Sequence, residues 1–147
     1  MIDKKDQIIL EELKKNSRNS TKSIASSIKI PRVTVHDRIQ KMLDKGIIKS
    51  FTTVVDYKKT GLASKVFVFV SFLHNTNVSQ RELANRIAKI QGIHEVHIIS
   101  GEYDLLLKVR GESLEKIGKL VVDKLRELKG VGKTLTCACF ETVKEEV

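Results

Sequence analysis

The residues best suited to chemistry lie between Pro31 and Lys49, and they are hydrogen-bond donors and cations. On a helix of about 100° per residue, the polar side chains of this stretch lie opposite an apolar stripe. A helix that enters the major groove needs donors for base edges near its N-terminal end and cations for phosphates along its sides. The predicted contacts to double-stranded DNA are Arg32, Val33, Thr34, His36, Arg38, Gln40, Lys41 and Lys49. Arg32, Thr34 and His36 are the candidates for base edges.

The distribution of charge favours the same partner. The net charge is +9, and residues 1–60 contain 14 Lys and Arg against 7 Asp and Glu, whereas residues 61–147 contain 13 against 11. A basic surface attracts polyanions. Asp37 argues against DNA because phosphate repels a carboxylate, although it could pair with Lys41 or accept from a cytosine amino group. A three-helix packing unit with solvated charges is the alternative interpretation.

Three helices must position these residues. Apolar residues at helical spacing predict a first helix from about Asp3 to Lys15, and Ser20 or Thr21 can cap a second, short helix. Pro31 suits the first position of a third helix, which is expected to end at Gly46. The residues expected to be buried on the third helix are Val35, Ile39, Met42 and Leu43.

The segment after Gly46 is rich in β-branched residues. The run Ile47–Val55 predicts a strand, which would form a wing with Lys49 near the DNA backbone. Together with the three helices, this strand predicts a winged helix-turn-helix.

The second half of the chain repeats one pattern. Residues 57–64 lose periodicity and are expected to be a linker. Strands are then predicted at 65–72, 93–99, 103–109 and 133–140, with helices starting at Ser79, where Glu82 completes a capping box, and near Ser113. Gly92 and Gly130 lie 38 residues apart, and so do the starts of the first and third strands, which indicates that one βαβ unit is used twice. The predicted order βαββαβ is typical of an antiparallel sheet backed by two helices.

The first of these strands is apolar on both faces. In a strand with one face in water, apolar residues alternate with polar ones, but Val66–Phe72 is almost entirely apolar. We therefore expect the sheet face without helices to be covered as well. The same face of a second copy would cover it in a twofold dimer, which could present two DNA-reading helices to neighbouring half-sites. A partly exposed sheet, or cover by the N-terminal domain, is the alternative.

The junction Ser100–Asp104 is a second candidate site. Gly101 permits a tight turn, and the backbone amides with Glu102, Tyr103 and Asp104 could hold both ends of a zwitterion. A purely structural hairpin turn is the alternative that residue types alone favour.

These residues resemble the Lrp/AsnC (leucine-responsive) regulators over nearly the whole chain. The resemblance is carried by Ile8-Ile9-Leu10, Arg18-Asn19-Ser20, Ile24-Ala25, Thr34 to Ile39, Gly46 to Lys49, Phe51-Thr52, Val54-Val55-Asp56, Gly61, Gly101-x-x-Asp104, Thr134-x-Thr136 and Thr142-Val143-Lys144. It implies an α+β chain, with an N-terminal winged helix-turn-helix that reads DNA and a C-terminal ferredoxin-like (ACT-like) sandwich. Pro31, Asp37 and Ser50 depart from the family pattern, which puts sequence preference in doubt and not the fold.

The same resemblance implies an effector and an assembly. In that family amino acids or related metabolites bind near the 100–104 loop, between dimers, in assemblies that are often octamers of four dimers. The implied effector residues are Ser100, Gly101, Glu102, Tyr103, Asp104, Thr134 and Thr136. Because Glu102 makes the loop acidic, a ligand with an amino group, such as lysine or arginine, is favoured. The expected domains are 1–56 for DNA, 57–64 as linker and 65–147 for dimerisation and effector binding.

Catalytic, cofactor and metal sites have no positive signal. No nucleophile–base pair, Walker loop or paired carboxylates occur, and His94 and His97 would point to opposite faces of a regular strand. Cys137 and Cys139 are too few for a zinc site and are expected to be small hydrophobes at a subunit contact. With no apolar run near membrane length, the chain is expected in the cytoplasm.

Two other functions are compatible with the sequence. Sirohaem decarboxylases resemble the same two-domain architecture, and retained absorbance in the Soret region would distinguish such an enzyme. A sequence-tolerant architectural DNA-binding protein is the other alternative, which competition with random DNA would distinguish.

Overall fold

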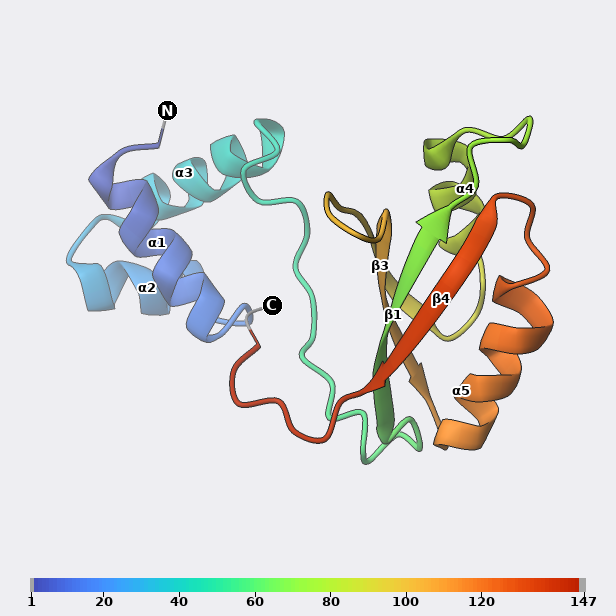
Figure 1. The fold of residues 1–147 in the computed structure, drawn as a ribbon. Coiled ribbons are helices and arrows are strands. Elements are labelled where there is room, and N and C mark those ends of the chain that lie inside the picture. The colour runs from blue at the N-terminus through green and yellow to red at the C-terminus, as the bar shows by residue number, and fades with distance from the viewer. Residues whose placement is uncertain (1, 146–147) are drawn as a thin grey trace. The chain divides into compact units, whose positions relative to one another are not determined.

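The computed structural model describes residues 2–145, and the chain divides after Val54 into two compact units (Figure 1). The N-terminal unit contains three helices, α1 (Lys4–Lys15), α2 (Thr21–Ile28) and α3 (Arg32–Asp44). Side chains cap the first two helices: the Asp3 carboxylate accepts from the amide of Asp6 at the start of α1, and the Ser20 hydroxyl accepts from the amide of Ser23 at the start of α2. The three predicted helices are confirmed.

The three helices pack around one small apolar core. Its buried members are Ile9, Leu13, Ile24, Ala25, Val35, Met42 and Ile48. Ile39 and Leu43, which the helical pattern also pointed inward, are half-buried against this core. Gly46 has a φ of 66°, a left-handed conformation that ends α3 and that a glycine adopts without strain.

Two local predictions in this unit are wrong. Pro31 is the N-cap of α3 and not its first helical residue, with an extended ψ of 139°. The run Ile47–Val55 forms no strand, since residues 2–54 contain only helices and connecting segments. A strand needs a neighbour that pairs with its amides and carbonyls, and no segment of residues 2–54 pairs with this run.

The C-terminal unit is an antiparallel sheet with helices. Its elements are β1 (Ser64–Phe72), α4 (Gln80–Ile87), β2 (Ile93–Ile98), β3 (Leu105–Gly111), α5 (Leu114–Leu120), a π-helical continuation (Val121–Leu125) and β4 (Val131–Ala138). The strand order is β2-β3-β1-β4, with every neighbouring pair antiparallel. The predicted βαββαβ order and α+β class are confirmed. Ser79 caps α4 as expected, but the Glu82 carboxylate bonds Arg86.

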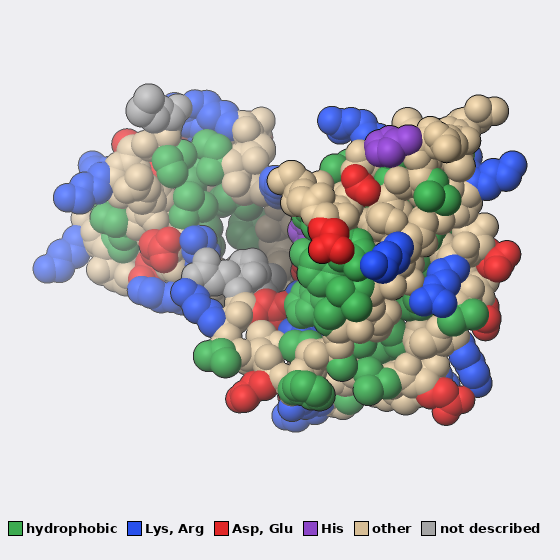
Figure 2. Space-filling view, in the orientation of Figure 1, with side chains coloured by type: hydrophobic (Ala, Val, Ile, Leu, Met, Phe, Trp, Pro, Cys, Tyr) green, Lys and Arg blue, Asp and Glu red, His purple; other side chains and the backbone are tan. Residues whose placement is uncertain are grey.

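One face of this sheet carries the core. Alternate residues of the two central strands are buried against α4, α5 and the π-helical turn: Val66, Val68, Val70, Leu105, Leu107 and Val109. The opposite face, here called the open face, carries Phe67, Phe69, Leu106, Leu135 and Cys137, which the strand register places side by side. In Figure 2 hydrophobic side chains form a continuous green area over the strands of this unit.

The segment 57–64 packs on the C-terminal unit. The Tyr57 ring lies 4.1 Å from the Arg110 guanidinium and 5.2 Å from the His94 ring. Strand β2 is irregular at His94, where the register shifts between Ile93 and Glu95. The prediction that His94 and His97 point to opposite faces assumed a regular strand, and that assumption is wrong.

Candidate nucleic-acid interface and effector loop

The outward face of α3 is the first candidate site. Val33 is 70 % exposed, and Arg32, His36, Asp37, Gln40 and Lys41 are exposed as well, whereas Thr34 is half-buried. Two of these side chains are held by neighbours, since Arg32 Nε donates to Thr21 Oγ1 at 3.3 Å and Gln40 Nε2 donates to Asp44 Oδ1 at 2.9 Å. The face thus presents donors on a rigid helix.

Arg38 is placed differently from the other candidates. Its Nη1 donates to Asp3 Oδ2 at 2.7 Å and to Asp6 Oδ1 at 2.8 Å, so the guanidinium joins α3 to the start of α1. Asp3 and Asp6 also cap α1 reciprocally through their backbone amides. The Asp6 amide and then Arg38 lower the pKa of Asp3, and the two carboxylates raise the pKa of Arg38. The carboxylates balance the charge of Arg38 within the unit.

The remaining charges of the α3 face have no partner in the part of the chain that the structure describes. Asp37 and Lys41 form no ion pair with each other or with another residue in 2–145, so the pairing considered from the sequence is absent there. Lys49, beyond Gly46, is exposed. Lys41 and Lys49 are therefore available to phosphates, and Asp37 stands as a carboxylate on the same face.

The 100–104 loop is the second candidate site. Ser100, Gly101 and Glu102 are exposed, and Gly101 has a φ of 130°, which requires glycine. Tyr103 packs against Phe69 with ring centroids 5.5 Å apart. This part of the loop offers backbone groups and one free carboxylate, that of Glu102, to a ligand.

Asp104 is occupied by the fold itself. Its carboxylate accepts from the Phe72 amide at 2.7 Å, and its amide donates to the Val70 carbonyl at 3.0 Å. Gln80 Nε2 donates to the backbone carbonyl of Asp104 at 3.2 Å. Asp104 ties the end of β1 to β3 and α4, so its side chain has a structural role in the single subunit.

The two threonines predicted for the effector lie apart from the loop within one subunit. Thr134 Oγ1 accepts from Arg126 Nε at 2.9 Å, and Thr136 lines a groove of about 280 Å³ beside α5. Strand β1 lies between β4 and β3. Two strand spacings, about 9–10 Å, therefore separate Thr134 from the start of β3. A single copy does not bring the seven predicted effector residues together.

Sequence reasoning missed the pairing of Arg38 and a cluster of buried cations, Lys65, Lys108 and Arg110, on the open face. The acidic Asp3-x-x-Asp6 spacing and the alternate Lys108-x-Arg110 spacing were the available signals. No group of three or more metal-ligating side chains occurs among residues 2–145, and no helix there is both long and apolar enough to span a membrane.

A three-helix DNA-binding unit joined to a βαββαβ unit defines a class of transcription regulator with an attached ligand-binding domain. Residues 2–49 match the model for winged helix-turn-helix DNA-binding, and residues 65–147 match the Lrp/AsnC ligand binding domain. The chain belongs to the Lrp/AsnC family and is a DNA-binding transcription regulator.

Relatives agree with this assignment, and a solved structure shares the fold. The chain is 47% identical over its whole length, and over 98% of the other chain, to an uncharacterised HTH-type transcriptional regulator of Pyrococcus furiosus. It is 38% identical to the HTH-type transcriptional regulator LysM of Sulfurisphaera tokodaii, covering 90% of this chain and 91% of that one. A transcriptional regulator from Neisseria meningitidis, solved in complex with L-Met, superposes with a TM-score of 0.93 at 20% identity, over 99% and 94% of the two chains.

Proposed function

We propose that the chain is a sequence-specific regulator that reads the major groove with the outward face of α3. The supporting observation is that this face is exposed and polar, on a helix anchored by an apolar core. The proposed base-edge contacts are Arg32, Thr34 and His36, with Val33 against a thymine methyl and Gln40 as a further donor. Lys41 and Lys49 would bind phosphates.

Arg38 supports this interface indirectly in the proposal. Its Nη1 is engaged by both Asp3 and Asp6, so its contribution to DNA binding is to fix the angle of α3 against α1. Asp37 excludes phosphate from its part of the face and favours a cytosine amino group there. In this proposal both residues affect the sequence preference of the protein more than its overall affinity for DNA.

We propose a dimer formed through the open face. Phe67, Phe69 and Leu106 are only half-buried, and Leu135 is 45 % exposed in one subunit. An apolar face of this kind is typical of an isologous contact. Leu135→Asp should yield monomers in sedimentation velocity, whereas Val122→Asp, an equally exposed site on the helix side, should leave dimers. Dimeric Leu135→Asp would count against this interface.

We also propose an amino acid effector at the 100–104 loop, between dimers. The distance between this loop and the two threonines in one subunit is consistent with a site completed by another copy. The Neisseria regulator of the same fold was solved with L-Met. The free Glu102 carboxylate favours a ligand with a side-chain amino group, such as lysine or arginine. An octamer of four dimers would provide such a site, and no catalytic activity is proposed.

Selection of bound duplexes from random DNA, with and without each of the twenty amino acids, tests the proposal. A consensus with about 10³-fold preference over random competitor at fixed salt is expected, and one amino acid should change the affinity. Recovery of no consensus would favour an architectural protein and contradict sequence-specific regulation. A consensus that no amino acid affects would contradict the effector alone.

A further inference from the structure

Three cations gather at one end of the open face. Lys65 extends from β1, and Lys108 and Arg110 extend from β3, where Lys65 and Arg110 are direct partners in the strand register. Their side chains are only 9 %, 11 % and 11 % exposed. Positive charges this far from water require anionic partners.

One carboxylate from the segment after β4 serves all three cations. Glu145 Oε2 lies 3.6 Å from Lys65 Nζ and 3.8 Å from Arg110 Nη2, while Oε1 contacts Lys108 Nζ. Glu95 adds a second carboxylate to Lys108 at 2.9 Å. Glu145 itself is 34 % exposed in one subunit. The cluster lies at the start of β1, beyond the apolar residues Phe67, Phe69 and Leu135 of the proposed dimer contact, so this carboxylate is at the rim of that contact.

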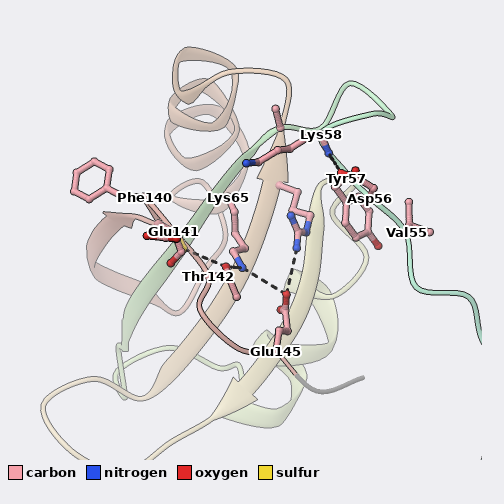
Figure 3. Close-up of a pocket in the computed structure, with 12 residues that line it drawn as sticks. Val55, Asp56, Tyr57, Lys58, Lys65, Phe140, Glu141, Thr142 and Glu145 are labelled. Atoms are coloured by element: carbon pink, nitrogen blue, oxygen red, sulfur yellow. Dashed lines mark hydrogen bonds and ion pairs between the residues drawn. The ribbon is translucent and has the colours of Figure 1, made fainter. Parts of the chain in front are cut away.

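A pocket of about 370 Å³ adjoins this cluster (Figure 3). Tyr57 and Lys58 form one wall, and Thr142, whose hydroxyl bonds Lys65, lies across from them. Arg110 stacks on the Tyr57 ring at 4.1 Å, which fixes its guanidinium plane. Burial lowers the pKa of Lys65, and the neighbouring Arg110 and Lys108 lower it further, so this ammonium gains from any added negative charge.

We propose that this pocket binds a small organic carboxylate, for which Glu145 is a tethered and displaceable substitute. The ammonium groups of Lys65 and Lys108 and the stacked Arg110 guanidinium converge there on one carboxylate, as they would on a free one. The Thr142 hydroxyl accepts from Lys65 Nζ and so positions that ammonium. Glu145 belongs to a segment outside the strands and helices, beyond the end of β4 at Ala138, so it can leave without breaking the sheet.

This site is separate from the proposed effector loop. The loop precedes Leu105 at one end of β3, and Arg110 lies near the other end. Five residues of extended strand place the two about 17 Å apart. The inference therefore stands or falls independently of the amino acid effector.

Calorimetric titration of the full chain with malonate at constant ionic strength tests this inference. Glu145→Gln removes the competing charge and should tighten malonate binding about tenfold, a change of about 1.4 kcal/mol. Glu127→Gln, an exposed site with the same charge change, should leave the affinity within twofold of the unmodified protein. Arg110→Gln should weaken malonate binding at least tenfold.

A second variant guards against a folding defect, because Arg110 also packs on Tyr57. Thr142→Val leaves that stacking intact and should weaken malonate binding severalfold. Inorganic phosphate, titrated in parallel, should bind more weakly than malonate. Three outcomes would each overturn the assignment. They are equal malonate affinity of Glu145→Gln and the unmodified protein, a gain in malonate affinity in Glu127→Gln equal to that in Glu145→Gln, and binding of phosphate without binding of malonate.

Discussion

Replacing Lys41 by Gln should remove one phosphate contact from each copy of α3. Lys41 is exposed and forms no ion pair with any residue in 2–145, so its loss should not disturb the fold. Each phosphate contact contributes about 0.9 to the slope of log affinity against log salt concentration, so a dimer should lose about 1.8 from that slope. At about 0.15 M salt, this counterion term alone corresponds to an affinity about 30-fold weaker.

Fluorescence anisotropy with the duplex recovered by selection, over a series of KCl concentrations, measures both quantities. Lys14→Gln is the matched control, because Lys14 lies near the end of α1 beside Glu11 and the change in net charge is the same. The control should retain the original slope. A Lys41→Gln variant with unchanged affinity and slope, or a control with equal losses, would refute the assignment of the α3 face.

Three further predictions concern the C-terminal unit. Gly92→Ala should destabilise it by about 1–3 kcal/mol in urea unfolding, since φ is 97° and a Cβ would lie 2.9 Å from Leu120 Cδ1. Leu107→Ala should cost about 2–5 kcal/mol, because this fully buried side chain leaves a cavity. Burial, then Arg110 and Lys108, lower the pKa of His94 below 6.5, so the urea midpoint should fall as pH drops below 6.5.

A control variant accompanies each of these three predictions. Gly118→Ala, on a helix with no atom within 4 Å of the added Cβ, should stabilise the unit slightly, and a loss equal to that of Gly92→Ala would contradict the backbone argument. Leu114→Ala, at a 56 % exposed site, should cost far less than Leu107→Ala. His94→Gln should flatten the pH dependence below 6.5, because the unfolded state then no longer binds an extra proton. An unchanged pH profile in that variant would exclude His94 as the source.

Features encoded by neighbouring residues could be predicted from the sequence. Ser20 caps α2 because its hydroxyl reaches an amide three residues away, and Gly46 ends α3 because only its own φ matters. The βαββαβ order followed from apolar runs such as Val66–Phe72, from capping residues such as Ser79, and from glycines in matching positions. Such signals lie within a few residues of the element that they specify.

Features that depend on distant partners could not be predicted. Ile47–Val55 has strand-forming residues, yet residues 2–54 offer it no strand to pair with. Arg38 lies on the flank of α3 in a helical projection, but its partner carboxylates are more than thirty positions earlier in the chain. The bond in which the Asp104 carboxylate accepts from the Phe72 amide joins residues 32 positions apart, and no local pattern indicated it. Each outcome is set by tertiary contacts that spacing does not report.

The central claim is that the outward face of α3 lies in the major groove. Its most direct test is a photo-crosslink to the selected duplex from p-benzoylphenylalanine at Val33, which is 70 % exposed on that face, with the same group at Ile8, 43 % exposed on α1, as control. Crosslinks to bases from position 33 and none from position 8 are predicted. Crosslinks from position 8 alone, or equally from both, would contradict the account.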